Sequence, residues 1–409
     1  MPTRSLDSID PRALGRRLQE ARKSRGLTQQ QAADALSLAR TTITAVEKGE
    51  RRTRAEEIVQ LANLYGRRVN ELLAPREPLP DFGVQFRTAM ARPGSSLIQD
   101  QADQAVSDFQ HLCEDYRQLE RLAGVVSVPS YPGQYPIEGI PVEYAAQDIA
   151  SSERNRLGLG DGPLLRLREL LEEDVGLRAF SIDLPSKIAG LFAYTDELGG
   201  CIAINARHPV ERRRWTLAHE YGHFLTSRYQ SEISVLGTYE RIPASERLAD
   251  AFAGCFLMPE SGLRRRFSEH SRSTGGSFTA AEVCRMAHYY AVSVEAMMRR
   301  LEQVGVLPRG TWERLRDRGF KVRDAQRQLG LVPQVTHERS MPARYEFLAV
   351  QAFQAGELSE GELARFLRTD RVSARQTVRR LTNAILLLNE GEIASVPIDM
   401  SSDILRREA

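Results

Sequence analysis

The sequence is poor in cysteine and contains no long apolar run. Its four cysteines, Cys113, Cys201, Cys255 and Cys284, lie far apart and form no C-x-x-C pair. This argues against a disulfide framework or a cysteine-based zinc knuckle and is typical of a reducing cytosol. The N-terminus lacks the apolar core of a signal peptide, and the longest apolar run, residues 251–258, is too short to cross a bilayer. We therefore expect a cytoplasmic protein with no membrane association.

The chain also lacks a strong net charge. Its 409 residues carry a formal charge of +2, with 42% hydrophobic and 27% charged residues, which is typical of a soluble globular protein with two or three domains. The charge is unevenly distributed, because residues 1–75 contain 14 Lys/Arg and 9 Asp/Glu, a net of +5, which leaves −3 for the rest. The basic excess at the N-terminus favours a nucleic-acid contact there.

Short helices are predicted across residues 12–73, followed by a proline-containing linker from Pro75. The pattern resembles an Xre/phage-repressor helix-turn-helix. The matching pieces are Leu18, Ala21-Arg22, Gly26 to Gln29, Ala32-Ala33, Thr42-Ile43, Val46-Glu47, Gly49 and Leu61-Ala62, whereas Ser37 replaces a common glycine of the turn.

The resemblance implies that the second helix of the motif enters the major groove of double-stranded DNA. The side chains expected at base edges or phosphates are those of Gln29, Arg40, Thr41, Thr42, Thr44, Arg51, Arg52 and Arg54. Such proteins often bind DNA as dimers, so the resemblance allows a homodimer, although the sequence does not reveal the oligomeric state. The alternative is a protein-docking module that has lost DNA binding.

Two histidines lie four residues apart in the pattern H-E-Y-G-H at residues 219–223. On a helix this spacing puts the imidazoles of His219 and His223 on one face, so both can reach a single ion. Glu220 can then activate a metal-bound water. The pattern predicts a zinc site, and the alternative is a chance match whose histidines bind no metal.

A catalytic zinc ion needs a third protein ligand. The longer pattern H-E-x-x-H-x-x-G-x-x-H is excluded, because Thr226 and Tyr229 stand where glycine and histidine would be needed. Downstream, Glu246 and Asp250 lie one helical turn apart and resemble the E-x-x-x-D arrangement of the thermolysin-like (gluzincin) class. There the glutamate binds zinc and the aspartate accepts the free N–H of a ligand histidine. A solvated acidic helix face is the alternative.

Further stretches resemble the ImmA/IrrE family of metallopeptidases, namely residues 157–163, 190–194, 202–205, 208–209, 215–225, 249–253 and 257–259. The resemblance implies zinc bound by His219, His223 and Glu246, with Glu220 as general base. It also implies a protein substrate, often a DNA-bound repressor that is cut at one site. The strand expected at residues 201–205 is the predicted sheet edge along which this substrate would lie.

Together these patterns predict a multidomain, mainly α-helical chain with a small β-sheet, whose strands are expected at 177–184, 188–195 and 201–205. The predicted parts are a five-helix helix-turn-helix domain at 1–75, a helical connector at 76–136, a zincin-like α+β peptidase domain at 137–265, its helical extension at 266–307 and a helical C-terminal region at 308–409.

Two features leave alternatives open. Cys113, in the predicted connector, is a candidate fourth ligand that would silence the metal site, but a small buried apolar residue is the favoured interpretation. In the tail, residues 358–365 and 372–381 are similar in pattern to a second helix-turn-helix. A plain helical pair that covers the core or forms a dimer is favoured there.

The sequence thus predicts a zinc-dependent, site-specific endopeptidase coupled to DNA binding. Its expected substrate is a transcriptional repressor encoded nearby, in a stress or phage-related response. The alternative is a DNA-binding regulator in which the zincin domain is a sensor. Glu220 favours retained chemistry, because a sensor would not need a general base.

Overall fold

The computed structural model divides the chain into two compact units, residues 1–110 and 111–409. Among the described residues, no helix is both long and apolar enough to span a membrane. The residues that the structure describes are 10–25, 27–65, 69–73, 96–124, 131–229, 232–235, 243–273, 275–331 and 340–386. The predicted linker after Pro75 lies outside them.

The N-terminal unit contains the five predicted short helices. They are α1 (Pro11–Ser24), α2 (Gln29–Ala35), α3 (Arg40–Glu47), α4 (Ala55–Leu64) and α5 (Val69–Leu73). The side chains of Asp10 and Thr28 cap the first two helices by accepting hydrogen bonds from backbone N–H groups. The first N–H groups of a helix have no partner within it, so such caps stabilise its start. Their apolar faces meet in one core around Leu18, Ile43 and Leu61. The predicted helical domain is confirmed.

The turn between α2 and α3 is tight. Ser37 has φ of 54°, in the left-handed region that favours glycine. The backbone N–H of Leu38 donates to the carbonyl of Ala33 at 2.9 Å and closes the turn. Serine therefore serves at this position although a glycine is common there.

The second unit is built on a four-stranded sheet in the order β1-β3-β2-β4. The strands are β1 (Arg178–Ile182), β2 (Ile188–Thr195), β3 (Gly199–Asn205) and β4 (Glu232–Val235). β3 pairs parallel with β1 and antiparallel with β2, and β2 pairs antiparallel with β4. The prediction that residues 201–205 form a free edge is wrong, because β3 is hydrogen-bonded on both sides. Instead β4, which was not predicted, lies at the edge of the described sheet next to β2.

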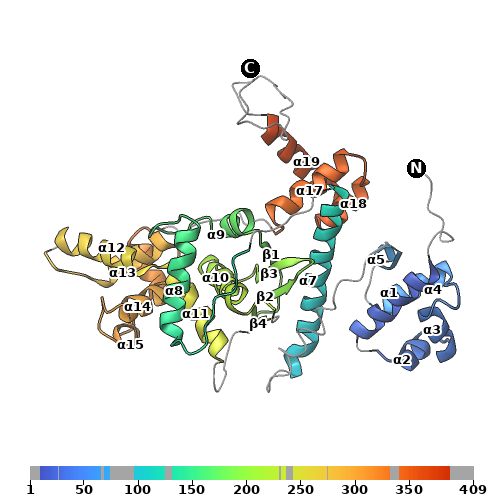
Figure 1. Ribbon diagram of the computed structural model, residues 1–409, viewed down its shortest axis with the longest axis horizontal. Coiled ribbons are helices and arrows are strands. Elements are labelled where there is room, and N and C mark those ends of the chain that lie inside the picture. Colours follow the sequence, from blue (N-terminus) through green and yellow to red (C-terminus); the bar gives the residue numbers. More distant parts are fainter. Residues whose placement is uncertain are drawn as a thin grey trace. The chain divides into compact units, whose positions relative to one another are not determined.

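Helices cover both faces of this sheet (Figure 1). One face, which includes Ile202 and Ile204, joins a core with α8 (Val142–Arg156), α10 (Val210–Ser227) and α11 (Ala244–Leu257). Side chains alternate along a strand, so Cys201 points to the other face, where it contacts Cys113 of α7 (Ser96–Leu122). The sheet thus separates the α10–α11 layer from the α7 layer.

The remaining elements are helical. Around the α10–α11 core lie α9 (Leu167–Leu170), a π-helical turn η2 (Leu171–Val175), α12 (Glu260–Ser273), α13 (Ala280–Tyr290), α14 (Val294–Gln303), α15 (Thr311–Asp317) and α16 (Val322–Gln328). On the α7 side lie α17 (Ala343–Gln354), α18 (Glu360–Phe366) and α19 (Arg371–Leu386). Tyr345 of α17 packs against Tyr116 of α7 and Phe180 of β1. The predicted fold class, mainly helical with a small sheet, is confirmed.

Candidate metal centre and nucleic-acid interface

The predicted metal ligands come together from two packed helices. α10 contributes His219 and His223, and α11 contributes Glu246. The two histidine Nε2 atoms are 3.1 Å apart. The Nε2 atom of His219 lies 3.4 Å from Oε2 of Glu246, and that of His223 lies 3.8 Å from Oε1. All three side chains are buried, so the donor atoms converge in a place shielded from bulk water.

These separations fit a zinc ion. Tetrahedral zinc ligands at about 2.0–2.2 Å from the ion lie about 3.3–3.6 Å from one another, and the three observed separations scatter around that range. Two imidazoles and one carboxylate are also a donor set that zinc accepts while keeping a position open. The residues present therefore fit the metal that the sequence predicts.

Asp250 orients the first histidine. Its Oδ1 atom lies 2.9 Å from Nδ1 of His219 and accepts the Trp215 indole N–H at 3.3 Å. An N–H at Nδ1 leaves the lone pair of Nε2 directed at the ligand cluster. Burial alone would lower the pKa of His219, but the hydrogen bonds to Asp250 and Glu246 outweigh it and raise that pKa to about 10. The carboxylates around His219 thus favour a positive charge at the ring, which is held as a proton when no metal is bound.

Glu220 is fully buried between α10 and the sheet. A Cβ atom on Gly190 of β2 would lie 2.6 Å from Oε1 of Glu220 and 2.7 Å from Cγ2 of Thr216, closer than such contacts normally allow. The negative charge of Glu220 also helps to raise the pKa of His219. The bare backbone of β2 therefore makes room for a carboxylate beside the ligand cluster.

Sequence reasoning missed Gly190 and Trp215, which hold Glu220 and Asp250 in place. Arg214 is a further residue that supports the site. This arginine is buried and donates to the carbonyls of Ala291, Leu165 and Leu164 at 3.0, 3.0 and 2.6 Å. Arg214 thus ties the start of α10 to its surroundings.

Cys113 is not among the residues that the structure gathers at the metal cluster. It contacts Cys201 on the opposite face of the sheet from α10. Burial raises the pKa of its thiol well above the ordinary value. This placement agrees with a small buried residue.

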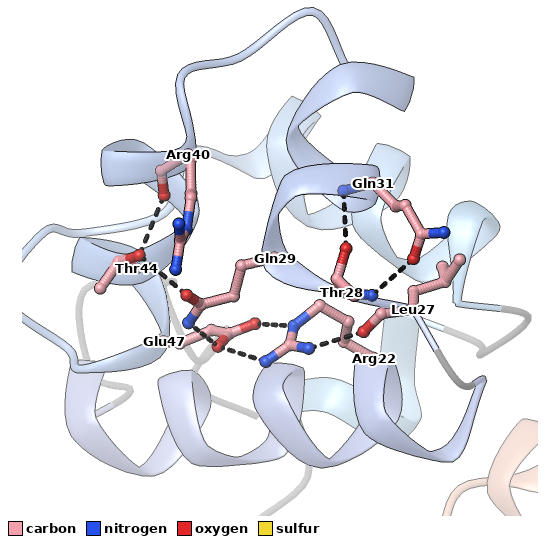
Figure 2. A network of polar contacts seen from close by, with 8 residues as sticks. All are labelled: Arg22, Leu27, Thr28, Gln29, Gln31, Arg40, Thr44 and Glu47. Carbon is pink, nitrogen blue, oxygen red and sulfur yellow. Dashed lines mark hydrogen bonds and ion pairs between the residues drawn. The ribbon is translucent and has the colours of Figure 1, made fainter.

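Several predicted DNA-contacting side chains meet at the start of α2 and α3 (Figure 2). The Gln29 amide donates to Oε2 of Glu47 at 2.9 Å, and its Oε1 lies 3.2 Å from the Thr44 hydroxyl. That hydroxyl is also 3.0 Å from the carbonyl oxygen of Arg40. Gln29 and Thr44 are thus fixed relative to each other, while Arg40 and Thr41 are exposed and Thr42 is half-buried.

A buried ion pair supports this surface. Arg22 donates to both carboxylate oxygens of Glu47, at 2.5 and 2.9 Å, and to the carbonyl of Leu27 at 2.6 Å. Figure 2 shows that Arg22, Glu47 and Gln29 form one continuous network. Both charged residues belong to the pattern that resembles a helix-turn-helix, but nothing in their spacing predicts that they form an ion pair.

The arginines after α3 differ in their surroundings. Arg51 donates to Glu57 at 2.7 Å, so its charge is partly compensated. Arg52 and Arg54 are exposed, and the backbone of Arg54 begins α4, where its N–H donates to Glu57 at 2.9 Å. The structure places Arg52 and Arg54 at the surface and Arg51 in an ion pair.

Two regions of the chain match known protein families. Residues 172–302 match the IrrE N-terminal-like domain, a peptidase family, and residues 18–72 match a helix-turn-helix family. No curated protein sequence matches the chain.

Solved structures give only distant similarity. ComR from Streptococcus suis is 12% identical, with 92% of this chain and 91% of that chain covered and a TM-score of 0.16. The apo form of the competence regulator ComR from Streptococcus vestibularis is 13% identical, with 80% and 100% covered and a TM-score of 0.15. At these TM-scores the similarity does not establish a shared fold. The two family matches do establish that the chain joins an Xre-type helix-turn-helix domain at residues 18–72 to an IrrE-like, metallopeptidase-type domain at residues 172–302.

Proposed function

We propose that the chain is a zinc-dependent endopeptidase that cuts a protein partner and acts in gene regulation. The convergence of His219, His223 and Glu246 beside the buried Glu220 carries this proposal. Asp250 supports it, because a sensor would not need a ligand histidine with a fixed tautomer and a carboxylate held against a glycine.

In the proposed reaction, zinc held by the three ligands would polarise the scissile carbonyl and acidify a water molecule. Glu220 takes the proton from the attacking water and delivers it to the leaving amine. Its burial keeps bulk water away from this transfer, and Gly190 leaves space for its carboxylate. Asp250 holds the imidazole of His219 in the orientation that binding requires.

We infer that β4, rather than β3, offers the sheet edge for an extended substrate. β4 pairs with β2 on one side only among the described strands, and an unpaired strand edge can add a peptide by backbone hydrogen bonds. The neighbouring strand β2 carries Gly190, against which the proposed general base Glu220 lies. The β4 edge is therefore one strand away from that base.

The proposed substrate is a transcriptional repressor encoded nearby, in a stress or phage-related response, and the N-terminal domain supports the link to DNA. The test is to incubate the zinc-loaded chain with that repressor, beside Glu220→Gln. We expect a single cut with the unaltered chain and none with the variant, which retains every ligand. Cleavage that persists in Glu220→Gln would contradict the mechanism. Operator binding without cleavage under any condition would favour the sensor alternative.

A further inference from the structure

The turn between α18 and α19 repeats the α2–α3 turn of the N-terminal domain. α2 and α18 are each seven residues long and begin with a capping box, at Thr28 and Ser359. Two residues after each helix the backbone turns left-handed, with φ of 54° at Ser37 and 53° at Arg368. The next helix begins three residues later in both cases. The two helix pairs therefore share their spacing and backbone conformation.

The hydrogen bonds of the two turns also correspond. Leu38 N–H donates to the Ala33 carbonyl at 2.9 Å, and Thr369 N–H donates to the Ala364 carbonyl at 3.0 Å. The fourth residue of each second helix is fully buried. Because the register agrees residue by residue, positions on α19 can be compared directly with those on α3.

The turn alone does not make a DNA-binding site, as α13 and α14 demonstrate. Ala291 has φ of 53°, and Val292 N–H donates to the Ala287 carbonyl at 3.0 Å. However, α14 buries half of its ten residues, and Met297 and Leu301 among them belong to the peptidase core. A helix buried in this way is not free to enter a DNA groove. The exposure and charge of the second helix therefore distinguish a DNA-binding pair from a structural pair with the same turn.

α19 has the exposure and charge that α14 lacks. It contains four arginines and no acidic residue. Arg371, Arg375 and Arg379 recur every four residues, which places them along one helix face, and all three are exposed. Val372 and Gln376 are exposed beside them. This face has the basic stripe that binds a phosphate backbone.

The contacts of this unit leave that stripe accessible. Arg375 forms an ion pair with Glu360 at 2.9 Å, in which the arginine is 61% exposed, and such exposed pairs are weak. On another side, Arg365 and Arg368 hold Asp115 of α7 at 3.3 and 3.0 Å. α18 and its turn are thus anchored to α7, while α19 can exchange a weak ion pair for phosphate contacts.

We propose that α17–α19 form a second unit that binds double-stranded DNA, with α19 in the major groove. Arg371, Arg375 and Arg379 contact phosphates, and Gln376 reaches base edges. The unit lies outside both family matches, and its binding depends on neither zinc nor peptide hydrolysis. The chain then contacts DNA at two places.

The first test measures binding of the full chain to a 40-bp duplex by fluorescence anisotropy over a range of salt. Arg371→Ala, Arg375→Ala and Arg379→Ala are combined, both in the natural chain and beside Arg40→Ala, which weakens the N-terminal site. We expect a tenfold or greater loss of affinity in both backgrounds. The slope of log affinity against log salt should fall by about 2–3, since each lost phosphate contact removes about 0.9.

The matched control replaces three exposed arginines that also face carboxylates, Arg285, Arg299 and Arg316. It should leave affinity and slope within twofold of the natural chain. An α19 triple variant that binds like the natural chain, or a control that loses as much, overturns the proposal.

Cross-linking supplies a measurement that does not depend on the triple variant folding. The four native cysteines are buried, so a thiol-linked photo-cross-linker can be directed to Gln376→Cys on α19. The control is Gln351→Cys, which replaces another exposed glutamine, on α17. We expect Gln376→Cys to cross-link duplex DNA at least fivefold more. Equal yields would overturn the placement of α19 in the groove.

Discussion

Asp250 acts on the metal site through a single hydrogen bond. Its carboxylate lies 2.9 Å from Nδ1 of His219, on the opposite side of the ring from the ligand cluster. That contact fixes which nitrogen faces Glu246 and raises the basicity of the ring. The residue would thus contribute to metal affinity without lying among the three proposed ligands.

Asp250→Asn should weaken zinc affinity about 10- to 100-fold, as outer-shell changes of this kind do. Competition with a fluorescent zinc chelator measures the change. Asp161→Asn is the control, because Asp161 pairs with Arg265 at 2.7 Å in the same unit. Equal affinity for Asp250→Asn and the natural chain would show that the hydrogen bond is unimportant for binding.

Glu47 makes the N-terminal unit sensitive to acid. Burial alone would raise its pKa, but hydrogen bonds from Arg22 and Gln29 outweigh this and lower the pKa. A carboxylate whose folded pKa is lowered stabilises the fold above its ordinary value of about 4.3. This stabilisation is lost as pH falls through the folded-state pKa.

Protection of α1–α3 from hydrogen exchange, corrected for intrinsic rates, should therefore fall as the pH drops from about 5 through the lowered folded-state pKa of Glu47. In Glu47→Gln the same helices should be less protected from exchange at pH 7, and their protection should decrease less on acidification. Identical pH dependence in the two proteins would contradict the role of this carboxylate.

The site residues differ in how far the sequence could predict them. His219, Glu220 and His223 follow from helical spacing alone, which is local. Gly190 and Trp215 could not be predicted, because their roles depend on β2 and α11 packing against α10. Contacts between distant segments leave no periodic pattern in a single sequence.

At the scale of elements, the long amphipathic helices and the three buried strands were predictable from their apolar patterns. β4 was not, because it is a four-residue strand with alternating polar residues, Glu232 and Ser234. α12 was also missed as a separate helix. Its sequence has few apolar residues, with Leu263 in the core, so helical periodicity is weak there. Elements that depend on contacts with neighbouring elements show the weakest apolar periodicity in the sequence.

The contact between Gly190 of β2 and Glu220 of α10 predicts that cleavage can be lost while the metal stays bound. In Gly190→Ala the new Cβ would displace Glu220 or Thr216, so cleavage of the proposed repressor substrate should fall at least tenfold while zinc stoichiometry stays at one. Metal analysis and a cleavage assay on one preparation check this. The control is Gly254→Ala in α11, whose Cβ would meet only Trp215 at 3.4 Å. It should cleave normally, and full activity in Gly190→Ala would contradict the account.

At the scale of the whole molecule, the two domains have separate hydrophobic cores that share no residue. Both tryptophans, Trp215 and Trp312, belong to the peptidase core, so tryptophan fluorescence reports on that unit alone.

The predicted division at residues 75, 136, 265 and 307 stays a prediction. Trp312 of α15 packs on the peptidase core although it lies beyond residue 307.

Removing zinc with a chelator should lower the denaturant midpoint seen by tryptophan fluorescence. A ligand present at a thousand times its Kd contributes about 4 kcal/mol to folding. Hydrogen exchange in α1–α4 should not change, since that core holds none of the ligands. Equal loss of protection in both units would show that they unfold together. His223→Ala, which removes a ligand, should abolish the response.

The Arg22–Glu47 pair has an evolutionary consequence. Losing either member leaves the other charge buried without its partner, which costs about 3–5 kcal/mol, whereas replacing both with apolar residues of similar volume can be neutral. Lineages can therefore cross from one state to the other only by changing both positions nearly together. Among homologues, positions 22 and 47 should covary more strongly than the exposed positions 40 and 41, whose substitutions are free to follow the operator sequence.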